Sequence, residues 1–156
     1  LNFPAGLVPR AQGVLPSEAE AAWERRMVAF RNEEGAYSRI QRTKPQTLGY
    51  ALLDSPVGLL AWILEKMHGW TDHRGDLFEA VDRETILANV TLYWLTGTAL
   101  SSIRLYYEAE HETPPFVPGR CEVPTAFARY PGEPWDVPRE VLERDRKSTR
   151  LNSSHT

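Results

Sequence analysis

The chain has 156 residues, of which 42% are hydrophobic, 10% aromatic and 25% charged. This composition is typical of one globular domain and excludes collagen, a coiled-coil rod and wholesale disorder. Lys and Arg number 18 against 21 Asp and Glu, which gives a net charge of −3. No excess of positive charge therefore exists to bind nucleic acid or an anionic membrane surface.

Two further features limit the class of protein. The longest apolar run, Val57 to Leu64, is well short of the roughly 20 residues that span a bilayer, so we expect no membrane segment in this chain. Cys121 is the one cysteine, which excludes an internal disulfide and suits a reducing compartment, so we expect a cytoplasmic location. The chain begins at Leu1, without a methionine or a leader, and we expect a fragment of a longer protein.

The first predicted helix starts at Ser17. Ser17 and Glu20 have the spacing of a capping box, in which the serine oxygen accepts the Glu20 N–H. Gly35 provides a C-terminal stop. An apolar stripe at helical spacing lies between them, formed by Trp23, Met27 and Phe30.

A second helix is predicted to start at Ser55, where Ser55 is the N-cap and Pro56 the first helical residue. It is predicted to end before Gly69. Its apolar stripe consists of Leu59, Leu60, Ile63, Leu64 and Met67.

A third helical stretch is predicted from about Asp82 to Tyr107. Its apolar residues are Ile86, Val90, Tyr93 and Trp94. Thr96, Gly97 and Thr98 interrupt the pattern, so we expect a bend or a division there.

The character of the chain changes after His111. Seven of the 12 prolines lie between Pro114 and Pro138, and only Arg120 to Phe127 has a strand pattern. Pro124 favours the end of a strand or an edge position, because proline cannot donate to a ladder. Residues 144–156 are almost entirely polar, and we expect a disordered, non-native tail.

The residues alone identify no catalytic or metal-binding motif. The sequence has no GxSxG elbow, P-loop, HExxH or paired CxxC. Tyr37, Tyr106 and Tyr107 could donate protons to a developing oxyanion, but tyrosines beside an apolar stripe more often simply pack. Glu133 lies in a loop past the predicted strand, where catalytic groups of α/β folds occur, and it also suits a solvated turn. The four histidines lack metal-ligand spacing: His68, His73, His111 and His155.

Several long segments closely resemble the microsomal-type epoxide hydrolases, which have the α/β-hydrolase fold. The main one is YSRIQRTKPQTLGYALLDSPVGL at residues 37–59. The resemblance continues in WILEK (62–66), NVTLYWLTGT (89–98), SSIRLY (101–106) and VPTAFARYPGE (123–133).

The resemblance implies an α/β-hydrolase fragment, made mainly of a helical cap, with one late core strand and proline-rich loops. Residues 1–15 would be the end of a core strand and a linker. Residues 16–95 would be the cap, and residues 96–143 the return to the core.

In that family an aspartate attacks an epoxide carbon while two tyrosines hold and protonate the oxygen that leaves this carbon. The tyrosine positions match Tyr37 and Tyr106, although the adjacent Tyr107 leaves open which phenol points inward. Water activated by a histidine then hydrolyses the ester, and the carboxylate beside this histidine matches Glu133. The resemblance implies a small apolar epoxide and water as reactants, no cofactor and no metal.

The motifs of the family's nucleophile and histidine are not found in these 156 residues, and His155 does not match the histidine. The intact parent is therefore expected to be the enzyme, and this chain alone to be inactive. Two alternatives stay open: a helical binding module without chemistry, and an esterase or dehalogenase of the same fold. Trp62, Tyr93 and Trp94 suit either a substrate pocket or a plain core.

Overall fold

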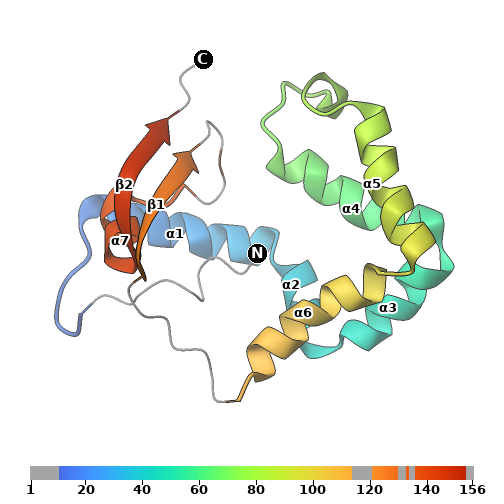
Figure 1. The fold of residues 1–156 in the computed structure, drawn as a ribbon, viewed down its shortest axis with the longest axis horizontal. Coiled ribbons are helices and arrows are strands. Elements are labelled where there is room, and N and C mark those ends of the chain that lie inside the picture. Colours follow the sequence, from blue (N-terminus) through green and yellow to red (C-terminus); the bar gives the residue numbers. More distant parts are fainter. Residues whose placement is uncertain (1–10, 114–120, 130–132, 134–135, 154–156) are drawn as a thin grey trace. The chain divides into compact units, whose positions relative to one another are not determined.

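The computed structural model describes residues 11–113, 121–129, 133 and 136–153 (Figure 1). The chain divides into two compact units. The mixed unit contains Leu1–Gly35 and Phe116–Thr156, and the helical unit contains Ala36–Pro115. Each unit is described by itself, and the predicted boundaries of the cap, residues 16 and 95, stay a prediction.

In the mixed unit, α1 (Glu18–Glu33) packs against α7 (Arg139–Asp145) and the segment before it. The predicted cap is confirmed, because the Glu20 N–H donates to the Ser17 Oγ at 3.1 Å. The Glu20 carboxylate also forms an ion pair with Arg144. The buried residues between these segments are Trp23, Met27, Val137, Val141 and Leu142. The short helix α7 follows a proline-rich stretch and was not predicted from the sequence.

The mixed unit also holds two parallel strands, β1 (Cys121–Arg129) and β2 (Arg146–Ser153). β1 confirms the predicted strand, although Arg120 lies outside the described residues. The register is irregular between Cys121 and Thr125, on either side of Pro124, as a residue without an N–H requires. The prediction of a disordered tail is wrong for residues 146–153, which form β2. Its polar sequence gave no strand signal because a ladder needs only backbone N–H and C=O groups.

The helical unit consists of α2 (Ala36–Thr43), α3 (Pro45–Asp54), α4 (Pro56–Trp70), a short η2 (Leu77–Glu79), α5 (Arg83–Thr96) and α6 (Ala99–His111). The predicted cap of α4 is confirmed, since the Gly58 N–H donates to the Ser55 Oγ at 2.9 Å. The predicted stop before Gly69 is wrong, because α4 runs through Gly69 to Trp70.

The predicted break in the third helical stretch is confirmed at Gly97, which has φ 65°. The Gly97 N–H donates to the Trp94 carbonyl and the Thr98 N–H to the Tyr93 carbonyl, both at 3.2 Å. These bonds end α5 in a Schellman motif. The axes of α5 and α6 differ by 85° as a result.

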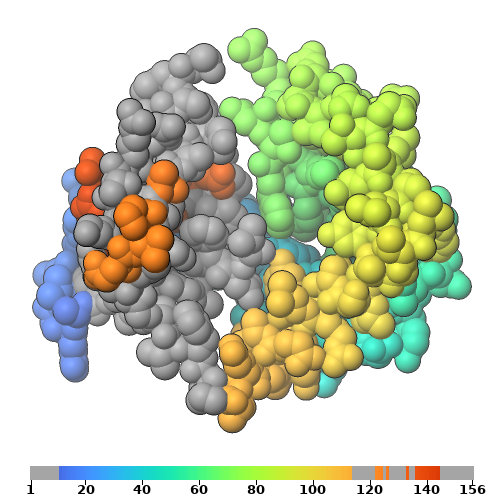
Figure 2. All heavy atoms as spheres, in the orientation of Figure 1, coloured from blue at the N-terminus to red at the C-terminus, as the bar shows by residue number. Residues whose placement is uncertain are grey.

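Beyond this break, α6 packs against both α2 and α3 (Figures 1 and 2). The contact with α3 is close at Gly49, where a Cβ would lie 2.4 Å from the Leu100 Cδ1. The buried core of the helical unit is formed by Leu52, Leu59, Val90, Ala99 and Ile103. Within the described part of the chain no one helix is long and apolar enough to cross a bilayer. Two bent pairs, α3 with α4 and α5 with α6, reach that length and composition only jointly.

We predict that Gly97→Ala destabilises the chain by about 1 kcal/mol, because an L side chain is strained at positive φ. The space around a Cβ at Gly97 is open, so no steric clash adds to this cost. Urea unfolding followed by circular dichroism measures it. Gly97→Asn is the matched control and should cost less, since asparagine tolerates this conformation. Equal losses for both variants would contradict the explanation.

Candidate active site

The helical unit contains an open cavity of about 500 Å³ lined by residues of α2, α3, α4, α5 and α6. Most of its surface is apolar, and the apolar lining includes Leu52, Leu59, Trp62, Ile63, Met67, Trp70, Ala99 and Ile103. The polar lining consists of Tyr37, Gln41, Lys66, Thr71, Asn89, Tyr93, Ser102 and Tyr106. A volume of this size is typical of a site for a small organic molecule.

Two tyrosines from helices distant in the sequence meet at this cavity. Tyr37 of α2 and Tyr106 of α6 lie edge to face, with ring centroids 6.0 Å apart and planes at 80°. The Tyr37 ring also lies edge to face with the Trp70 ring, with centroids 5.2 Å apart. Tyr107 instead stacks on the His111 ring, with centroids 4.0 Å apart. Of the two adjacent tyrosines, Tyr106 is therefore the one that lines the cavity.

Burial, together with charge repulsion from Tyr106 and a hydrogen bond with it, raises the pKa of the Tyr37 phenol to about 12. Arg42 acts in the opposite direction and lowers this pKa. A phenol with this pKa is neutral near pH 7 and remains a hydrogen-bond donor.

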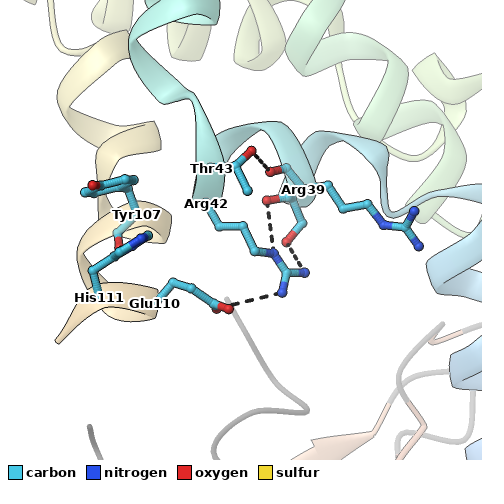
Figure 3. Close-up of polar contacts among 7 residues, drawn as sticks. Arg39, Arg42, Thr43, Tyr107, Glu110 and His111 are labelled. Carbon is cyan, nitrogen blue, oxygen red and sulfur yellow. Dashed lines mark hydrogen bonds and ion pairs between the residues drawn. The ribbon is translucent and has the colours of Figure 1, made fainter. Parts of the chain in front are cut away.

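Arg42 is fixed by its own helix and by α6. Its guanidinium donates to the backbone carbonyl of Ser38 at 3.4 Å and to the Ser38 Oγ at 3.3 Å (Figure 3). It also lies 3.8 Å from the Glu110 carboxylate, which joins the end of α2 to the end of α6 (Figure 3). The positive charge of Arg42 therefore interacts with the Glu110 carboxylate as well as with the Tyr37 phenol.

Sequence reasoning missed five polar residues of the lining, among them Lys66 and Gln41. The Lys66 Nζ lies 5.6 Å from the centre of the Tyr37 ring and 5.5 Å from that of Trp70, and it pairs with Glu65 at 2.9 Å. Gln41 is only 3% exposed. The signal that could have indicated Gln41 is its spacing, since it follows Tyr37 by four residues and so lies on the same helix face.

The remaining predicted residues have varied surroundings. Glu133 is half-buried in the mixed unit, where its backbone carbonyl accepts from the Asp136 N–H at 3.2 Å. Its relation to the tyrosines stays a prediction. Trp62, Tyr93 and Trp94 all pack against the core, and Trp62 and Tyr93 also line the cavity. Among the residues that the structure describes, no three His, Cys, Asp or Glu side chains are grouped to hold a metal ion.

No protein-family model matches the chain. Several known proteins are nevertheless similar to it in sequence. Epoxide hydrolase 1 of Sus scrofa is 40% identical over 124 residues, which cover 70% of this chain and 26% of that protein. A relative in Stigmatella aurantiaca is 38% identical over 143 residues, 92% of this chain and 32% of that protein. The chain thus spans about a third or less of the length of the curated relatives it matches.

Solved structures agree with these relatives. The Aspergillus niger epoxide hydrolase is similar over 92% of this chain and 34% of its own, with 30% identity and a TM-score of 0.66. The juvenile hormone epoxide hydrolase of Bombyx mori is similar over 79% of this chain and 33% of its own, with 34% identity and a TM-score of 0.68. The helical unit and its cavity are accordingly part of an α/β-hydrolase fold. The chain belongs to the epoxide hydrolase family.

We predict that one of the six tyrosines of the chain ionises late, at a pH of about 12, and that Tyr37→Phe removes this late step. Absorbance of the tyrosinate band during alkaline titration measures it. Tyr106→Phe should move the late step to lower pH, because Tyr106 helps to raise the Tyr37 pKa. The folded state holds this proton more tightly than the unfolded chain, whose tyrosine pKa is 10.0. The contribution of Tyr37 to stability is therefore complete below pH 10 and is lost as the pH rises toward 12. A late step that persists in Tyr37→Phe would contradict the assignment.

Proposed function

We propose that the protein to which this chain contributes hydrolyses an epoxide to a vicinal diol. The observation that carries the proposal is the pair of phenols, Tyr37 and Tyr106, that meet at an apolar cavity. The names of the relatives support the same reaction. The reactants would be a largely apolar epoxide, held in the cavity, and water.

Tyr37 and Tyr106 would bind the epoxide oxygen and stabilise its developing charge. In the first step a carboxylate oxygen forms a bond to an epoxide carbon, the ring C–O bond breaks, and the released oxygen takes a proton from a phenol. A neutral phenol suits this task, because it is a donor before the ring opens and its pKa lies well below that expected of an alkoxide's conjugate acid. The resemblance assigns the attacking carboxylate to an aspartate that the 156 residues do not contain.

Glu133 would act in the second step, in which water hydrolyses the covalent ester. A carboxylate beside a histidine fixes its tautomer and stabilises the imidazolium that forms when the histidine takes a proton from water. The half-buried position of Glu133 after β1 supports this role, since catalytic groups often follow strands in α/β folds.

The direct test is incubation of the full-length gene product with styrene oxide, with the diol quantified by chromatography. We expect diol formation above the buffer rate, and none from the 156-residue chain alone, because the ester-forming and base residues lie in other segments. Binding of the epoxide by the full-length protein without any diol would instead favour the non-catalytic binding module.

We predict that Tyr37→Phe and Tyr106→Phe each slow ester formation in the full-length protein by about 10²-fold, as the loss of one oxyanion donor does elsewhere. The double variant should be slower still. Rapid-quench mass spectrometry of the covalent ester gives this rate. Tyr107→Phe is the matched control, since Tyr107 stacks on His111, and it should retain the wild-type rate. A loss in Tyr107→Phe as large as in Tyr106→Phe would refute the assignment of Tyr106.

We predict that Glu133→Gln lets the covalent ester accumulate, because attack by an aspartate needs no base whereas attack by water does. The same quench experiment reports the amount of ester. Glu122→Gln, at an exposed position of β1, serves as the control and should show no accumulation. If Glu133→Gln slowed ester formation and no ester built up, Glu133 would not be the partner of the histidine.

A further inference from the structure

Gln41 is the most enclosed polar side chain of the cavity lining. It is 3% exposed, whereas the other polar lining residues are half-buried or exposed. Gln41 lies on α2 one helical turn after Tyr37, so both side chains are on the same face, with Cβ atoms about 5–6 Å apart.

The Gln41 carboxamide has no hydrogen-bond partner among the residues that the structure describes. Other polar side chains nearby are satisfied within the fold: the Ser38 Oγ accepts from Arg42, and the Ser102 Oγ donates to the Ala99 carbonyl at 2.7 Å. The amide atoms of Gln41 are not fully enclosed, and Gln41 lines the cavity, so the carboxamide is available to a bound molecule.

An apolar occupant of the cavity would displace the water that reaches this amide and leave the amide unpaired, which is costly, so the position favours an occupant that supplies a hydrogen-bond partner. The surrounding surface is apolar, which suits an occupant that is apolar except for one polar group. If the two phenols hold an epoxide oxygen, a polar group of the same occupant can reach Gln41, because Gln41 lies one turn from Tyr37 on the same helix face and lines the same cavity.

We infer that Gln41 determines substrate specificity by donating a hydrogen bond from its side-chain amide to an oxygen that the substrate carries near the epoxide ring. The preferred substrate class is then an apolar epoxide with an adjacent ether, ester or hydroxyl oxygen, ahead of a pure hydrocarbon epoxide. This inference rests on the proposed epoxide hydrolysis.

The test compares two substrates of the same shape in the full-length protein: benzyl glycidyl ether and 5-phenyl-1,2-epoxypentane, in which a CH₂ replaces the ether oxygen. The wild type should favour the ether by about tenfold in kcat/KM, because the hydrocarbon leaves the Gln41 amide unpaired. Gln41→Met, of similar volume and without a donor, should reduce this preference to about one. Gln46→Met is the matched control, because Gln46 is exposed on α3, and it should keep the wild-type preference.

Three outcomes would overturn the inference. The first is a wild-type ratio of kcat/KM near one for the two substrates, which needs no variant. If Gln41→Met does not fold, Gln41→Leu takes its place. Equal losses on both substrates in Gln41→Met would show that Gln41 only supports the position of Tyr37. Diol formed from neither substrate by the wild type would remove the proposed function, and this inference with it. In the first two outcomes the proposed function stands.

Discussion

The left-handed turn at Gly97 is the constraint on which the helical unit depends. Without it, α5 and α6 would form one continuous helix, and a rise of 1.5 Å per residue would carry Tyr106 roughly 14 Å beyond the break. The turn instead changes the helix direction by 85° and returns α6 to α2 and α3. Both the close approach at Gly49 and the meeting of Tyr106 with Tyr37 follow from this return.

Packing of α6 on α2 also sets the electrostatics of the cavity. The same burial that brings the two phenols together raises the Tyr37 pKa, and Arg42 opposes this rise. Arg42 joins α2 to α6 through its ion pair with Glu110, between two partly exposed side chains. The contact that holds the two helices together therefore keeps the cation outside the apolar space, where its effect on the phenol is moderated by solvent and by a carboxylate.

The sequence predicted those elements whose signals are local. The caps at Ser17 and Ser55 and the break at Gly97 each depend on a few neighbouring residues, and all three are confirmed. α2 and α3 were missed because their buried positions include Ser38, Gln41 and Gly49, which give no apolar periodicity. The tyrosine pair came only from the resemblance, since Tyr37 and Tyr106 are far apart in sequence and meet only through tertiary packing. Gln41 was missed for a related reason, because burial of a polar residue cannot be recognised before its cavity is known.

Neutral donors suit this cavity better than cations. A buried ammonium or guanidinium must be paired at all times, whereas a neutral phenol can be buried at little cost. Consistent with this, two cations that interact with Tyr37 each lie beside a carboxylate, Lys66 beside Glu65 and Arg42 near Glu110. In the proposed reaction, negative charge appears on oxygen only as the epoxide ring opens. Two neutral phenols and a neutral amide would then bind the uncharged substrate without a permanent charge, and the phenols would strengthen their hydrogen bonds only at the step where stabilisation lowers the barrier.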